Sequence, residues 1–192
     1  MNDTVIAAAA AYIQDLFRGN SGGHDAEHSL RVYRGALLIA EGEPACDREV
    51  VALAALLHDA DDHKLFRTED NANARAFLTA QKVTPEKIEQ ICRAINAVSF
   101  SQNRGRRPDT LEGRIVQDAD RLDALGALGI ARTVAYGGEH GRPLEDSIAH
   151  FHEKLLLLRD ELNTETARRI AAPRHAFLEQ FLAEYEKESG LR

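Results

Sequence analysis

The sequence predicts a single all-α domain. Alanine is abundant along the chain, and the alternation of valine, isoleucine or threonine with polar residues that is typical of strands is absent. The chain has 192 residues, 44% of them hydrophobic, which is enough for one domain with a buried core. No internal repeat and no linker divides it, so we expect residues 1–192 to form one domain.

Turn residues and caps delimit the expected helices. Glycines end the first two helices, in the turn 19–23 and at Gly42, and Thr84 caps a helix that Pro85 opens. The run 50–57 is apolar on nearly all sides, so its helix belongs in the middle of the fold. The expected helices cover residues 3–18, 25–41, 47–59, 70–81, 84–98, 111–136, 144–161 and 164–187.

The second half of the chain contains the less regular segments. Residues 99–110 have the composition of a loop and include three arginines. The helical stretch 111–136 is expected to divide into two pieces around residues 120–126, and Gly137 and Gly138 are expected to end it. Pro173 is expected to kink or split the last helix, because a proline inside a helix costs about 3 kcal/mol.

The composition excludes several classes of protein. A formal net charge of -7 argues against a nucleic-acid scaffold, which needs a surplus of lysine and arginine. The longest apolar runs are well short of the roughly 20 residues that cross a bilayer, and no basic stretch precedes the first of them. Cys46 and Cys92 form no paired motif, so each is expected to be a buried thiol. We therefore expect a cytoplasmic protein without nucleic-acid or membrane partners.

Three polar motifs stand out against the apolar helices. They are HDAEH at residues 24–28, HD at 58–59 and DADRLD at 118–123. Burying a histidine and an aspartate without partners would cost several kcal/mol, and a divalent cation is one partner that satisfies both. For the pair at 58–59 taken alone, a hydrogen-bonded pair that faces solvent at the end of a helix is the alternative interpretation.

Taken together, the motifs resemble the H…HD…D signature of the HD-domain metal-dependent phosphohydrolases, an all-α family. The segments HDAEHSLRV, LLHDADDHKLF and QDADRLDALGALGIAR are similar to the bacterial subfamily that includes YedJ and YpgQ, and the later FHEKLLLL and TETARR fit it too. The resemblance runs from about residue 24 to 184. It implies one HD domain, with a metal-site core over about 24–125 and C-terminal helices over about 144–190.

The resemblance implies a metal site built from two imidazoles and two carboxylates, those of His28, His58, Asp59 and Asp120. His28 is assigned rather than His24 because the family's first ligand is the histidine three positions before the arginine, here Arg31. A mixed nitrogen and oxygen set suits Mn²⁺, Fe²⁺, Co²⁺, Ni²⁺ or Mg²⁺. HD proteins with two metals need further histidines before the last aspartate, and this chain has none between His63 and His140, so one ion is expected.

The resemblance also implies three catalytic residues near the metal. In mononuclear HD nucleotidases a carboxylate three positions after the HD aspartate orients the attacking water, and here that position is Asp62. Lys64 and Arg31 would neutralise charge on the phosphate oxygens. The alternatives are that Asp62 is a solvated loop acid, that Lys64 is a surface residue, and that Arg31 pairs with Asp25 or Glu27.

Substrate contacts are expected from the basic loop and from the start of the second helix. Arg104, Arg106 and Arg107 would hold a polyphosphate tail, and His24 would face the substrate or support the ligands. The alternative for the arginines is plain solubility, and for His24 a place on the surface at the helix start. Relatives in the subfamily often have a histidine where this chain has Val98, a departure that bears on substrate range or rate.

The subfamily resemblance implies hydrolysis of (deoxy)nucleoside triphosphates to a monophosphate and pyrophosphate. A 5′-nucleotidase and an alarmone-type hydrolase are alternatives, although alarmone hydrolases usually have HDxxED where this chain has Asp62 and His63 at the last two positions. An α-helical binding module stabilised by its metal is an alternative from another class. The exposed apolar positions of the last helices leave a homodimer open.

Overall fold

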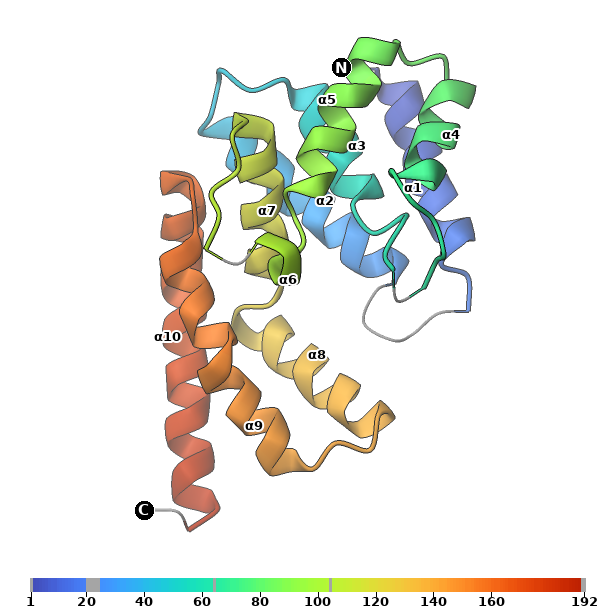
Figure 1. Cartoon of the computed structure of the whole chain (residues 1–192). Helices are drawn as coiled ribbons and strands as arrows, with labels where there is room; N and C mark the ends of the chain where they lie inside the picture. Colours follow the sequence, from blue (N-terminus) through green and yellow to red (C-terminus); the bar gives the residue numbers. More distant parts are fainter. Residues whose placement is uncertain (1, 20–24, 64, 104, 191–192) are drawn as a thin grey trace. The chain divides into compact units, whose positions relative to one another are not determined.

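The computed structural model describes residues 2–19, 25–63, 65–103 and 105–190. Every regular element within these ranges is a helix (Figure 1), which confirms the predicted all-α class. By its contacts the chain divides into two compact units, Met1–Asp120 and Arg121–Arg192. In the described ranges, no helix is both long enough and apolar enough to cross a membrane.

The first unit is built around one buried helix. It contains α1 (Asp3–Leu16), α2 (Ala26–Glu41), α3 (Arg48–Leu57), α4 (Ala72–Ala80), α5 (Pro85–Asn96), the short α6 (Phe100–Asn103) and most of α7 (Leu111–Asp123). Every residue of α3 from Val50 to Leu57 is buried. Helices α1, α2 and α5 all pack against α3, which confirms its predicted central place (Figure 1).

Side-chain caps explain where most of these helices begin. Asp25 accepts a hydrogen bond from the backbone N–H of His28 at the start of α2, and Asp47 accepts those of Glu49 and Val50 at the start of α3. Helix α4 differs, because Asn71 at its N-cap position has a left-handed backbone and makes no side-chain cap. Asp61, ten residues earlier in the chain, accepts the hydrogen bonds of this helix start instead.

The second unit contains α8 (Gly126–Glu139), α9 (Leu144–Glu153), the 3₁₀ helix η1 (Leu155–Glu161) and α10 (Glu165–Glu188). Helix α10 packs against α8 and η1. The last three residues of α7 belong to this unit, and two of them form ion pairs in it: Arg121 with Glu161, and Asp123 with Arg132. The predicted interruption of the helical stretch 111–136 is present, between α7 and α8.

Four details differ from the predictions. The loop 99–110 contains the one-turn helix α6, and the expected helix 144–161 is divided into α9 and η1. Helix α8 continues through both glycines to Glu139, and Gly137 is buried where an added Cβ would lie 2.4 Å from the Oγ of Ser147. Close packing, rather than a helix end, therefore accounts for Gly137. Helix α10 is not split at Pro173, an exposed position where the carbonyl that loses its donor is open to water.

The two cysteines are free thiols. Cys92 is buried in α5, and burial raises its pKa to about 11, so it stays protonated at neutral pH. Cys46 is half-buried, and the prediction of a buried thiol is wrong there. It lies in the turn between α2 and α3.

Candidate metal centre

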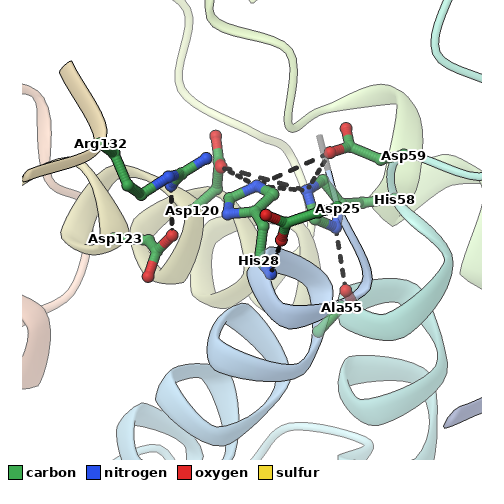
Figure 2. Close-up of polar contacts among 8 residues, drawn as sticks. All are labelled: Asp25, His28, Ala55, His58, Asp59, Asp120, Asp123 and Arg132. Atoms are coloured by element: carbon green, nitrogen blue, oxygen red, sulfur yellow. Dashed lines mark hydrogen bonds and ion pairs between the residues drawn. The ribbon is translucent and has the colours of Figure 1, made fainter. Parts of the chain in front are cut away.

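Three helices of the first unit bring four polar side chains together (Figure 2). His28 lies in the first turn of α2, His58 and Asp59 follow the last residue of α3, and Asp120 lies on α7. Helix α7 approaches α2 closely next to this point, since a Cβ at Gly35 would lie 3.7 Å from that of Ala119. Residues separated by up to 92 positions in the sequence thus meet at one place.

The donor atoms of the four side chains converge. The Nε2 atoms of His28 and His58 are 3.2 Å apart, and Oδ1 of Asp120 lies 3.2 Å from the first and 4.0 Å from the second. Oδ2 of Asp59 lies 3.6 Å from Nε2 of His28 and 3.4 Å from that of His58. Two ligands bound side by side to one divalent ion, each at about 2.1 Å, are about 3 Å apart, so this spacing fits one ion.

The other ring nitrogen of His58 is held by the backbone. Nδ1 lies 2.9 Å from the carbonyl oxygen of Ala55, and a carbonyl only accepts, so Nδ1 carries a proton. Nε2 is therefore the ring nitrogen of His58 that faces the other three donors (Figure 2). A histidine with this backbone partner is the form that binds a metal through Nε2.

The burial of the cluster is uneven. The side chains of His28 and His58 are 4% and 3% exposed and that of Asp59 is 10% exposed, whereas Asp120 retains 26%. Burial alone would raise the pKa of Asp120, but a hydrogen bond from His28 and the charges of both imidazoles outweigh it and lower the pKa. The carboxylate of Asp120 is thus ionised at neutral pH and faces the more open side of the cluster.

The chemistry of this donor set fits a divalent metal ion. It offers two imidazole nitrogens and two carboxylate oxygens with no thiolate, which is the mixed set that first-row divalent ions and Mg²⁺ accept. The atoms of His28, His58 and Asp120 that could hold an ion all lie within 4.8 Å of one another. The assignment of all four side chains as ligands stays a prediction, and the identity of the metal is open.

The structure describes two of the three predicted catalytic residues, Asp62 and Arg31. Asp62 is half-buried in the turn after the ligands, where its backbone N–H donates to the carbonyl of Asp59 at 3.1 Å. Arg31 is half-buried on α2, one turn after His28 and on the same face of the helix. Lys64 lies outside the described residues. The catalytic roles of all three stay predictions.

Two of the predicted substrate-binding residues line a pocket of about 270 Å³ in the first unit. Arg106 and Arg107 lie there with Arg93 of α5 and with Thr110, the residue before α7. Thr110 and Asp120 are ten residues apart, or about 15 Å along the helix axis.

His24 and Arg104, the other two predicted substrate-binding residues, lie outside the described residues. Val98, at the position where relatives often have a histidine, is 3% exposed and belongs to the apolar core. Arg93 and Asp61 have no role that the sequence predicted. Asp61 lies ten residues before the N-cap position of α4, and Asp70, beside that position, is the acid that the sequence offers as a cap.

The comparison with known proteins agrees with this geometry. The sequence matches the HD domain family over residues 25–125, more than half of the chain and a range that includes all four predicted ligands. The chain belongs to the HD-domain family of metal-dependent phosphohydrolases. It is similar to YpgQ of Bacillus subtilis, with 40% identity in an alignment of 186 positions that covers 92% of this chain and 90% of YpgQ.

Solved structures of relatives share the fold over nearly the whole chain. The crystal structure of Bacillus subtilis YpgQ in complex with ADP has a TM-score of 0.82 and 37% identity, and the match covers 95% of this chain and 97% of that one. An HD-superfamily hydrolase from Bacillus thuringiensis has a TM-score of 0.81 and 34% identity, with 100% of both chains covered. The predicted resemblance to the YpgQ-like subfamily is therefore confirmed.

Proposed function

We propose that the protein hydrolyses nucleoside triphosphates to nucleoside monophosphates and pyrophosphate, with one divalent ion held by His28, His58, Asp59 and Asp120. The observation that carries this proposal is the convergence of donor atoms of His28, Asp59 and Asp120 on Nε2 of His58, the ring nitrogen that does not bind the backbone. The complex of the relative YpgQ with ADP supports a nucleotide as the substrate.

The reaction adds water across the bond between the α- and β-phosphates. When bound, a divalent ion supplies positive charge that stabilises the developing negative charge on phosphate oxygens. Asp62 orients the attacking water and accepts its proton, while Arg31 and Lys64 balance the charge of the transferred phosphoryl group. Arg106 and Arg107, which line the pocket before α7, hold the polyphosphate tail of the substrate.

A panel of nucleotides tests the proposal. Nucleoside triphosphates, 5′-monophosphates and a guanosine tetraphosphate are assayed with Mn²⁺, Co²⁺, Ni²⁺ and Mg²⁺ in turn, and pyrophosphate and orthophosphate are measured separately. We expect pyrophosphate from triphosphates. Orthophosphate from monophosphates would identify a 5′-nucleotidase instead, and metal binding without any hydrolysis would identify a non-catalytic module.

Two ligand variants and a matched control test the site. His58→Ala and Asp59→Ala are expected to abolish turnover and to reduce the metal content from about one ion per chain to near zero, because each removes a predicted ligand. His152→Ala, an exposed histidine in the second unit, serves as the control and should retain both. Full activity in His58→Ala would contradict the proposed site.

A further inference from the structure

We infer that Asp61 is a positioning residue for the metal centre, anchoring the turn that carries His58 and Asp59 to the start of α4. The inference rests on the metal site proposed above and adds to it a residue that does not itself bind the ion. It depends on the contacts of Asp61 and on the way α4 begins.

Both carboxylate oxygens of Asp61 accept backbone hydrogen bonds from α4. Oδ1 accepts the N–H of Asn73 at 2.9 Å, and Oδ2 accepts that of Ala74 at 3.0 Å. The side chain of Asn73 in turn donates a hydrogen bond from Nδ2 to the carbonyl oxygen of Ala60, at 2.8 Å. Three hydrogen bonds therefore join the two residues after Asp59 to the first turn of α4.

The start of α4 depends on this distant carboxylate. Asn71, at the N-cap position, has φ 55° and makes no side-chain cap, and Asp70 before it also has a positive φ of 51°. The side chain of Asn71 instead donates to Oδ1 of Asn96 at 3.0 Å. Because the first N–H groups of a helix have no partner within the helix, Asp61 supplies what the residues next to α4 do not.

The backbone of the turn after α3 is also held by local hydrogen bonds. Helix α3 ends at Leu57, and beyond it the N–H of Ala60 donates to Leu57 and that of Asp62 to Asp59, at 3.0 and 3.1 Å, while Leu65 and Phe66 donate to Asp62. Helix α4 packs against α5, and α5 packs against the central α3. Anchoring the turn to α4 therefore connects the backbone of Asp59 to the packed body of the unit, which restricts the directions its carboxylate can take.

Cobalt affinity measures this effect apart from activity. Co²⁺ is titrated into the metal-free full-length protein and followed by its visible absorption, and thermal unfolding is measured on the same samples. Asp61→Ala is expected to bind Co²⁺ about 10-fold or more weakly than the wild type, the size of effect seen when residues that support metal ligands are removed. Asp61→Asn, which keeps one accepting oxygen, is expected to recover most of the affinity, to within about three-fold.

Asp47→Ala is the matched control. Asp47 has the same chemistry, a carboxylate that accepts the N–H groups of Glu49 and Val50 at 3.0 and 3.2 Å, but it lies at the opposite end of α3 from His58. It should lower the unfolding temperature while leaving the Co²⁺ affinity within about two-fold of the wild type. If Asp47→Ala loses as much affinity as Asp61→Ala, the effect is general destabilisation and the inference is overturned.

The remaining outcomes separate the inference from the proposed function. If the wild type and Asp61→Ala bind Co²⁺ equally well, the positioning role is overturned and the proposed metal site stands. If the wild type binds no Co²⁺, the positioning role and the proposed metal site are both overturned. Should Asp61→Ala fail to fold, Asn73→Ala decides, because it removes the side-chain bond to the carbonyl oxygen of Ala60: weaker Co²⁺ binding supports the inference, and unchanged binding overturns it.

Discussion

Acidic side chains around the metal centre have the same functional group but different partners. Asp25 accepts the backbone N–H of His28 at 2.6 Å, which begins α2 at the turn that carries this ligand. Asp61 accepts two backbone N–H groups of α4. Because both carboxylates are engaged at helix starts, they hold the backbone near the site, whereas the family resemblance implies that Asp62 activates the water.

Asp62→Asn tests that role. An amide cannot accept the proton of the attacking water, so kcat should fall by about 10²- to 10⁴-fold, the usual contribution of a general base. The metal content should stay near one ion per chain, because Asp62 is not among the predicted ligands. Both quantities are measured, by initial rates and by elemental analysis. Asp146→Asn, at an exposed position of α9, is the control, and an unchanged kcat in Asp62→Asn would remove the residue from the mechanism.

Arg107→Ala tests the basic pocket. If the guanidinium binds the polyphosphate tail of the substrate equally well in the ground state and the transition state, its removal should raise KM by about 10-fold and leave kcat nearly unchanged. Steady-state kinetics over a range of substrate concentrations separates the two constants. Arg159→Ala, which removes an exposed arginine from the second unit, controls for net charge. Equal KM values in the two variants would favour the solubility interpretation of the loop.

At the scale of whole helices, an ion-pair network joins the starts of α3 and α5. Nζ of Lys87 lies 3.1 Å from the carboxylate of Asp47 and 2.9 Å from that of Glu49. The hydrogen bond from Lys87 lowers the pKa of Glu49; for Asp47, burial would raise the pKa, but bonds from Lys87 and from the N–H of Val50 outweigh it. Both groups therefore favour the folded state most strongly when they are ionised.

The sign of the pH dependence follows from these lowered pKa values. The stabilisation is fully present above the pKa values of the unfolded chain, near pH 4, and is lost as the pH falls through the lower values of the folded state. Lys87→Met should lower the free energy of unfolding at pH 7 by about 1 kcal/mol or less, because the 42% exposed side chain of Asp47 is screened by solvent. Urea unfolding between pH 6 and pH 3 should show a steeper loss for the wild type than for Lys87→Met. Parallel losses would contradict the network.

Some features of the helices could be predicted from the sequence, and others could not. The central place of α3 followed from its apolar run, because a helix without a polar face has to be buried. The start of α5 followed from Thr84 and Pro85, whose effects are local. Gly137 was misinterpreted as a helix end because its reason, the contact with Ser147, comes from a helix that follows it in the chain.

For the molecule as a whole, both units are helical and the chain matches HD-superfamily structures over its full length. Leu157 of η1 and Phe177 of α10 are 43% and 47% exposed, as expected for the last helices, and the homodimer stays a prediction. The negative net charge of -7 remains an argument against nucleic-acid partners. It is compatible with a small nucleotide, since a bound cation would neutralise part of the acidic surplus at Asp59 and Asp120.

The sequence by itself determined the helical class, the family and the four predicted ligands, because these depend on residue types at characteristic spacings. Only the tertiary structure decided that their donor atoms converge, that Nδ1 of His58 binds the backbone while Nε2 faces the other donors, and that Arg93 joins Arg106 and Arg107 in one pocket. The inferred role of Asp61 also depends on the tertiary structure. Its partners are backbone N–H groups, which every residue except proline has, so no residue type in the sequence marks them.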